Sequence, residues 1–124
     1  LLHHYDYKVD MEEIKNNLRP YEDIGLELKE YYKRPRPMEF AEIHNLEFTP
    51  RADNTYSGSY SYPSGHVLGA LMFYHIYGKK YPHLKHKLLK YCQRMKISRE
   101  VMGVHFPSDC NFSFYVYNKL KNKL

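Results

Sequence analysis

The sequence lacks the long apolar run that marks a membrane protein. Its main apolar stretch, at residues 67–72, is far shorter than the roughly 20 residues that a membrane-spanning helix needs. The mean hydropathy of −0.72 agrees with this. We therefore expect a soluble domain without a transmembrane segment, which could touch a bilayer only from outside.

Cysteine is also scarce, with only Cys92 and Cys110. The pair forms neither a CxxC motif nor a zinc-ligand spacing. A disulfide between them is one interpretation, and two free, half-buried thiols is the one we favour. The first residues, 1–7, lack the apolar core of a signal peptide, so none is visible in this chain. The compartment stays unknown.

Positive charge is in excess, with 19 Lys and Arg against 14 Asp and Glu, a net charge of +5. Such a surface favours anionic partners, whether nucleic acid, phosphate esters or acidic lipids. The basic residues lack the aromatic interleaving or known motif of a nucleic-acid reader, so we expect no nucleic-acid partner. The 14 tyrosines are interpreted mainly as packing at the edge of the core.

No segment alternates as a strand would, and there are no internal repeats, so the sequence predicts an all-α fold. We expect a single domain over residues 1–124, a compact bundle of about five or six helices. The predicted helices cover about 10–18, 20–32, 64–78, 82–102 and 107–120. The third is apolar nearly all round and should lie in the middle of the bundle. Residues 38–63 have no period and are predicted to form one long active-site loop.

Three short segments combine cations, histidines and helix starts. They are Lys29 followed after six residues by Arg36-Pro37, then Pro63-Ser64-Gly65-His66, and Ser98-Arg99 followed by His105 and Asp109. An arginine guanidinium offers a planar fork of donors that matches phosphate oxygens. The N–H groups at a helix start bind anions, and a glycine there lets the anion come close.

The spacing of His105 and Asp109 is that of neighbours on a helix start. At this spacing Asp109 can accept a hydrogen bond from one ring nitrogen and leave the other free to attack. Cations and N–H groups would hold the phosphoryl oxygens, with a nucleophile on one side and an acid on the other. The three segments together predict a phosphoryl-transfer site without a metal.

These segments resemble the signature of the type 2 phosphatidic acid phosphatase superfamily, which includes the vanadium haloperoxidases. Its pattern is Lys-x6-Arg-Pro, Pro-Ser-Gly-His and Ser-Arg-x5-His-x3-Asp, and all eleven fixed positions are present between residues 29 and 109. The surroundings of the first two segments look most like the soluble class A acid phosphatases. The chain is an unusually short form, since it lacks much of their N-terminal part.

The resemblance implies a role for each matched residue. His105 would form a phosphohistidine, Asp109 would orient it, and His66 would protonate the leaving group and then activate water. The phosphate-binding residues would be Lys29, Arg36, Ser64, Gly65 and Arg99. No metal or other cofactor is implied, and phosphate or vanadate should bind at the site. The helices that wall the substrate entrance in the longer soluble members would be either missing here or supplied by a second subunit, which would make the protein a homo-oligomer.

Other residues near the segments carry weaker expectations. Ser98 could bond Asp109, the backbone or the ligand, and Tyr60 and Tyr62 could line the substrate entrance. Lys33 and Arg34 are interpreted equally well as a basic rim or as solvated surface.

The sequence therefore predicts a metal-independent acid phosphatase that acts on small phosphomonoesters. A lipid-phosphate or diphosphate hydrolase is the alternative within enzymes. The alternative outside enzymes is an anion- or nucleic-acid-binding domain, which would have no need of His66 and Asp109 beside the cations.

Overall fold

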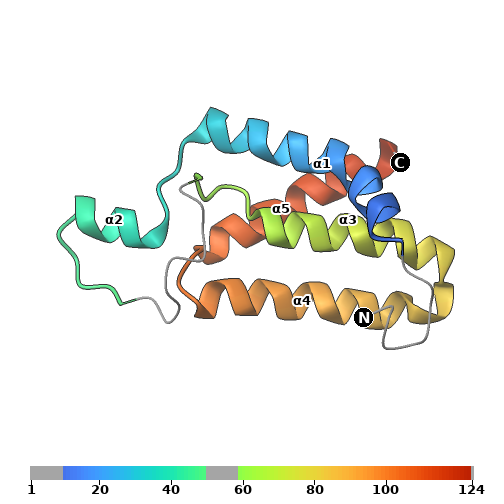
Figure 1. The fold of residues 1–124 in the computed structure, drawn as a ribbon. Coiled ribbons are helices and arrows are strands. Elements are labelled where there is room, and N and C mark those ends of the chain that lie inside the picture. Colours follow the sequence, from blue (N-terminus) through green and yellow to red (C-terminus); the bar gives the residue numbers. More distant parts are fainter. Residues whose placement is uncertain (1–9, 50–58, 124) are drawn as a thin grey trace.

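The structure, a computed structural model, describes residues 10–49 and 59–123. Every regular element in these two ranges is helical, which confirms the predicted all-α class. Four long helices form the bundle, fewer than the five or six predicted: α1 (Met11–Tyr32), α3 (Gly65–Lys80), α4 (Lys85–Val101) and α5 (Pro107–Leu120) (Figure 1). The seven-residue α2 (Pro37–Ile43) stands apart from them, and short 3-10 helices cover Pro82–Leu84 and Lys121–Lys123.

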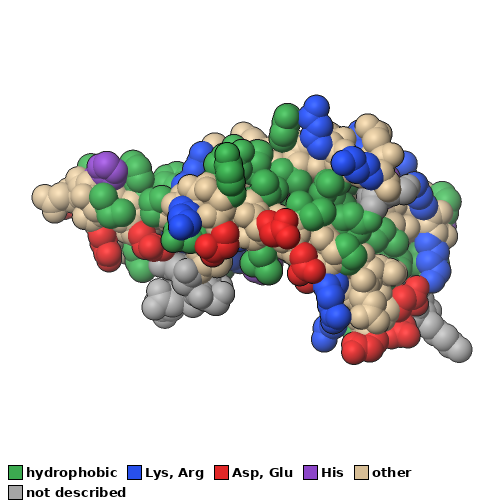
Figure 2. All heavy atoms as spheres, turned by 90° about the horizontal axis from the view of Figure 1, so that it is seen from above, with side chains coloured by type: hydrophobic (Ala, Val, Ile, Leu, Met, Phe, Trp, Pro, Cys, Tyr) green, Lys and Arg blue, Asp and Glu red, His purple; other side chains and the backbone are tan. Residues whose placement is uncertain are grey.

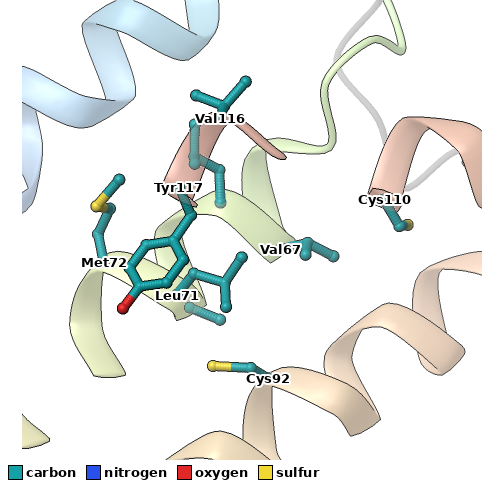
Figure 3. Packing of buried hydrophobic residues seen from close by; sticks show 9 residues of the cluster. Val67, Leu71, Met72, Cys92, Cys110, Val116 and Tyr117 are labelled. Atoms are coloured by element: carbon teal, nitrogen blue, oxygen red, sulfur yellow. The ribbon is translucent and has the colours of Figure 1, made fainter. Parts of the chain in front are cut away.

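Helix α3 lies in the middle of the bundle and contacts α1, α4 and α5, as its apolar sequence predicts. Side chains on several of its faces are fully buried, among them Val67, Leu71 and Met72. They pack against Cys92 of α4 and the buried side chains of α5 (Figure 3). Full burial of one such aliphatic side chain stabilises the fold by about 1.5–3 kcal/mol, so α3 is the main source of hydrophobic stabilisation.

Helix α1 begins as predicted but does not break where predicted. The side chain of Asp10 caps it by accepting hydrogen bonds from the N–H groups of Glu12 and Glu13. A new helix at Pro20 was the prediction, and it is wrong, because Pro20 lies inside one continuous helix. Leu18 and Tyr21 on either side of the proline both pack on the core, and this packing outweighs the backbone hydrogen bond that proline cannot make.

Two further boundaries differ from the sequence prediction. Gly78 does not end α3, which runs on to Lys80, and its backbone does not adopt the left-handed conformation of a glycine stop. The stretch predicted as irregular from residue 38 to 63 contains α2 at its start. The middle of that predicted loop, residues 50–58, lies outside the described residues.

One end of the bundle gathers the segments that carry the sequence motifs. The C-terminal ends of α1 and α4 meet there with the N-terminal ends of α3 and α5 (Figure 1). Gly103, with φ of 77°, turns the chain between α4 and α5 in a conformation that favours glycine. This turn brings His105 back over the end of the bundle.

The described helices include none that is both long and apolar enough to cross a membrane. Cys92 and Cys110 are free and completely buried, more deeply than the half-buried thiols that we favoured. Burial raises the pKa of Cys92 to about 12 and that of Cys110 to about 11, so both stay protonated at neutral pH.

Candidate active site

His105 and Asp109 form a buried pair at the start of α5. Nδ1 of His105 lies 3.3 Å from Oδ2 of Asp109, and the same oxygen accepts a 2.8 Å hydrogen bond from the N–H of Phe106. Asp109 is completely buried and His105 is 3% exposed. Burial lowers the pKa of His105 to about 4, although its hydrogen bond to Asp109 acts in the opposite direction. The ring is therefore neutral at physiological pH.

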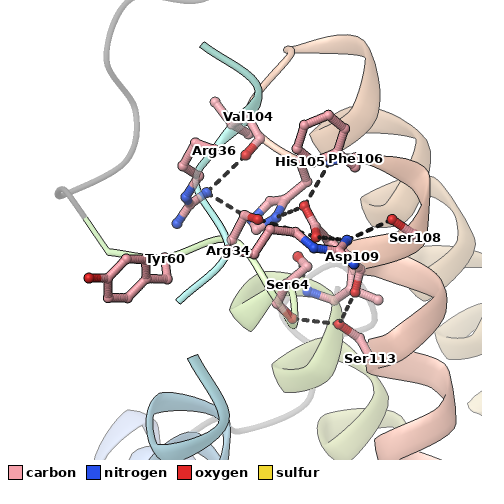
Figure 4. Close-up of polar contacts among 12 residues, drawn as sticks. Arg34, Arg36, Tyr60, Ser64, Val104, His105, Phe106, Ser108, Asp109 and Ser113 are labelled. Carbon is pink, nitrogen blue, oxygen red and sulfur yellow. Dashed lines mark hydrogen bonds and ion pairs between the residues drawn. The ribbon is translucent and has the colours of Figure 1, made fainter. Parts of the chain in front are cut away.

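Arg36 determines which nitrogen of His105 carries the proton. Its Nη1 lies 2.9 Å from Nε2 of His105, and a guanidinium has donors only. Nε2 must therefore accept this hydrogen bond, which leaves the single proton on Nδ1, facing Asp109 (Figure 4). The same Nη1 also donates to the Val104 carbonyl, and Nε and Nη2 donate to Ser59. Nε2, the atom with the lone pair, thus faces the predicted phosphate-binding side.

The second oxygen of Asp109 has partners that the sequence analysis missed. Nη1 of Arg34 donates to Oδ1 at 2.8 Å, and the hydroxyl of Ser61 lies 3.2 Å from the same oxygen. Ser61 is completely buried. The sequence did contain one signal for this contact. Arg34 and Arg36 are two residues apart in a segment in which they alternate with prolines, and residues two apart point the same way if such a segment is extended.

Lys29 is a buried cation in the last turn of α1. It is 6% exposed, and its Nζ donates to the Tyr60 carbonyl at 2.7 Å. Burial lowers the pKa of Lys29 to about 8, and the positive charge of Arg36 acts in the same direction. Lys29 therefore carries its proton in most molecules at neutral pH. Burial of this charge has a free-energy cost, which a bound anion would offset.

Arg99 is a buried cation in the last turn of α4. It is 7% exposed, and its Nε has no hydrogen-bond partner among the described residues. Its Nη1 lies 3.9 Å from the sulfur of Met102, which is a weak acceptor. Burial lowers the pKa of Arg99. A buried guanidinium with so few acceptors is costly unless an anion completes its surroundings.

The start of α3 places Ser64, Gly65 and His66 at the same end of the bundle. The buried Ser64 hydroxyl caps the helix by accepting from the Val67 N–H, and the Ser64 carbonyl accepts from Ser113 at 2.8 Å. Gly65 and His66 are exposed. A Cβ atom on Gly65 would lie 3.9 Å from Cε of Lys29, so the helix start faces that lysine.

The ring of His66 lies in a strongly positive environment. Partial burial lowers its pKa, and nearby positive charges lower the pKa further. Those charges belong to Arg99, Arg36 and Lys29. The same three cations that the motifs single out thus act together on one histidine, which indicates that the structure brings the predicted residues to one place.

Some residues with weaker expectations have other contacts. Ser98 is exposed, and its hydroxyl lies 3.7 Å from the sulfur of Met102. Tyr60 contributes its carbonyl to Lys29, and Tyr62 stacks on Phe112 with ring centroids 3.9 Å apart. Neither interpretation of Arg34 included its ion pair with the buried Asp109, although its side chain stays 34% exposed.

The charge balance of the buried site is positive. Lys29, Arg36 and Arg99 are buried cations, and among the described residues Asp109 is the only buried carboxylate. Its two oxygens are already engaged. No three of the His, Cys, Asp and Glu side chains in the described ranges gather closely enough to hold a metal ion. The arrangement is therefore complementary to an anion with several oxygens.

An apolar cavity of about 570 Å³ opens beside this site, between α1, α3 and α4. Lys29, Gly65 and His66 line one part of it, and Phe73 and Met95 are among the apolar residues that line the rest. Gly65 and Phe73 are eight residues apart on α3, so the cavity extends about 12 Å along that helix. Figure 2, which views the molecule from the side of α1, shows hydrophobic side chains gathered over its middle.

Comparison with known proteins assigns the family. Residues 22–116 match the family model described as the PAP2 superfamily, and this range contains all the motif residues. No curated protein and no solved structure matches the chain. The match covers most of the sequence, and the chain therefore belongs to the PAP2 superfamily. At this coarse level it is a phosphoric ester hydrolase of the phosphatase type.

Proposed function

We propose that this PAP2 superfamily member is a metal-independent acid phosphatase that hydrolyses small phosphomonoesters through a phosphohistidine. The proposal treats residues 1–124 as one phosphatase domain. The observation that carries it is the excess of buried positive charge beside a neutral, oriented histidine. Three buried cations without a matching number of buried carboxylates are stabilised by binding a polyanion. The ring nitrogen beside them has a lone pair and can attack an electrophile.

In the first step, the phosphoryl group binds among Lys29, Arg36 and Arg99. The Arg36 N–H that now meets Nε2 of His105 turns to a phosphoryl oxygen. Nε2 then attacks phosphorus while the bond to the ester oxygen breaks. The N–H groups at the start of α3 also face the phosphoryl oxygens there. His66 gives its proton to the leaving alkoxide, and the ring of His105 keeps the proton on Nδ1, from which it donates a hydrogen bond to Asp109.

In the second step, the phosphohistidine is hydrolysed. His66, now neutral, takes a proton from water, and the resulting hydroxide attacks phosphorus. The Nε2–phosphorus bond breaks, so His105 returns to its starting neutral form and inorganic phosphate leaves. Vanadate is expected to bind at the same place, because its five-coordinate form has the geometry of these transition states.

The decisive test is the substitution His105→Ala. Hydrolysis of p-nitrophenyl phosphate should fall to background, and rapid acid-free quenching with labelled substrate should trap no protein-bound phosphate. His86→Ala, at an exposed histidine near the start of α4, is the matched control and should keep the wild-type rate. Wild-type turnover in His105→Ala would show that another residue is the nucleophile.

The apolar cavity favours a second candidate, a hydrolase of phosphate esters with a long hydrocarbon group. One part of the cavity is lined by Lys29 and His66, so an ester bound at the cations could lay its leaving group along α3. Each methylene that the cavity takes out of water contributes about 0.8 kcal/mol, or roughly a fourfold gain in binding. A sugar phosphate would gain nothing comparable from these walls.

A series of alkyl phosphates separates the two candidates. If the cavity binds the leaving group, kcat/KM should rise with chain length in the wild type and level off in Gly69→Leu. Gly69 lines the cavity, and a Cβ atom built on it meets no other atom within 4 Å, so a larger side chain can start there and take up part of the cavity. A flat chain-length series in the wild type would exclude the lipid-type substrate and leave small phosphomonoesters.

A further inference from the structure

We propose that Arg34 is a positioning residue of this site, which holds the Asp109 carboxylate so that the pair directs Nε2 of His105 at the phosphoryl group. The proposal rests on the proposed role of His105 as nucleophile. It assigns to Arg34 no contact with the substrate. Its action runs through Asp109 alone.

The first support is the geometry of the segment that joins α1 to α2. Arg34 and Arg36 are two residues apart in this segment, and both reach the buried pair. Nη1 of Arg36 lies 2.9 Å from Nε2 of His105, and Nη1 of Arg34 lies 2.8 Å from Oδ1 of Asp109. The contacts thus run in one chain from Arg36 through His105 and Asp109 to Arg34 (Figure 4).

The second support is the set of hydrogen bonds at Asp109. The bond from Nδ1 of His105, at 3.3 Å, is the longest of four, and the bonds from Arg34 and from the Phe106 N–H are both 2.8 Å. These two shorter bonds grip different oxygens of the carboxylate. A carboxylate held at both oxygens cannot rotate about its own axis, so the hydrogen bond that Nδ1 of His105 donates to it has a fixed direction.

The third support is that Arg34 is itself held in place. Its guanidinium carbon lies 3.9 Å from the centroid of the Tyr62 ring, and that ring stacks on Phe112. Nη1 also donates to the Ser108 hydroxyl at 2.7 Å. A guanidinium can stack by its face and donate by its edge at the same time, which a lysine ammonium cannot. The backbone is fixed too, because the Ser61 N–H donates to the Arg34 carbonyl.

This arrangement predicts a defect in the chemical step. Without Arg34, Oδ1 of Asp109 keeps only the longer hydrogen bond from the Ser61 hydroxyl, so the carboxylate is held less firmly and the ring of His105 is aimed less well. Loss of the hydrogen-bond partner that orients a metal-ligating side chain lowers activity by about 10–100-fold, and we expect a similar loss here, because Arg34 orients Asp109 in the same way. The cations that bind phosphate remain, so KM should change little. The Asp109 charge would also be less compensated, and the acid limb of the kcat/KM profile should move to higher pH.

The test compares three variants with the wild type on p-nitrophenyl phosphate. Arg34→Met should lose about 10–100-fold in kcat with a nearly unchanged KM. Arg34→Lys keeps the positive charge but lacks the planar guanidinium donors. Compared with Arg34→Met, it should therefore recover the position of the acid limb but only part of kcat. Arg19→Met removes an exposed arginine ten residues before Lys29 on the same helix and should behave as the wild type.

A wild-type kcat and acid limb in Arg34→Met would overturn the proposal, and so would a rise in KM alone, which would indicate a substrate contact. If Arg34→Met does not fold, Arg34→Lys decides by the same comparison of kcat with KM. If the wild type hydrolyses no phosphate ester, the proposed function fails but Arg34 can still be tested. The ¹⁵N shifts of the His105 ring, titrated with pH, should then show a higher pKa in Arg34→Met, and an unchanged titration would overturn the positioning role.

Discussion

At the scale of single residues, Arg99 has an environment that is unfavourable without a ligand. It is buried, and its Nε lacks a partner among the described residues. We expect Arg99→Met to raise the free energy of unfolding without ligand, on the order of 1 kcal/mol, because a buried, poorly paired charge is removed. The same change should lower kcat/KM by about 10²–10³-fold, as loss of one oxyanion donor does.

Thermal unfolding with and without phosphate measures both effects of Arg99→Met. Phosphate should raise the Tm of the wild type much more than that of the variant. Arg94→Met, at an exposed arginine on the same helix, is the control and should change neither quantity. A variant that is less stable without ligand and equally stabilised by phosphate would show that Arg99 is a structural residue.

The two histidines predict the pH dependence of kcat/KM. Activity needs neutral His105, whose pKa is lowered by burial to about 4, and protonated His66, whose pKa is lowered by partial burial and nearby cations. With increasing pH, kcat/KM should rise around pH 4. It should fall again around a second pH that is lower than 6.5, the ordinary pKa of histidine. A plateau that extends above pH 7.5 would contradict the role of His66 as proton donor.

The same shift of His105 affects stability, and its sign follows from proton binding. The unfolded chain binds a proton at this histidine below about pH 6.5, whereas the folded protein binds it only near pH 4. Stability is therefore expected to fall as the pH drops between these values. Urea midpoints at pH 7 and pH 5 measure this loss, which should be smaller in His105→Ala.

Sequence reasoning at the residue scale finds what a linear spacing encodes. The four-residue spacing of His105 and Asp109 predicts their contact, and the structure has it. The role of Arg34 depends on a contact with a residue 75 positions away in the sequence. No local pattern specifies such a contact, since it depends on how α5 meets the segment after α1.

At the scale of elements, the continuity of α1 gives a direct prediction. Pro20 lies inside this helix, where proline costs about 3 kcal/mol relative to alanine. Pro20→Ala should therefore raise the free energy of unfolding, by up to about that amount, in urea denaturation. Were Pro20 the first residue of a separate helix, as the sequence alone predicts, the substitution would be neutral or destabilising. Turnover should be unchanged, since Pro20 is nine residues from Lys29.

Sequence reasoning was most accurate at the helix starts that carry a local signal. Asp10, Ser64 and Pro107 each mark a helix start that the structure has at the same place or one residue away. Pro20 and Gly78 gave false boundaries, because packing of α1 and α3 on the core overrides the local preference of a single residue. The short α2 has too few residues for a periodic pattern.

At the scale of the whole molecule, the residues of the proposed site all lie at one end of the bundle. The buried cations, the histidines and Asp109 lie where α1 and α4 end and α3 and α5 begin. The apolar pattern of α3 predicts the central helix and hence the bundle. The packing of the helices determines how their ends are brought together. In the sequence, only the order of the motifs indicated this arrangement.

This placement of the site at one end has a consequence for how the protein can adapt to temperature. Stabilising changes often cost activity when they stiffen the residues that do the chemistry. Here the opposite end of the bundle holds the Asp10 cap, the last turn of α3 and the turn at Pro82–Leu84, about 24 Å along α3 from the first. Selection or engineering can reinforce that end without stiffening the end that holds the proposed active site, so we expect that thermal tolerance and turnover can be improved independently.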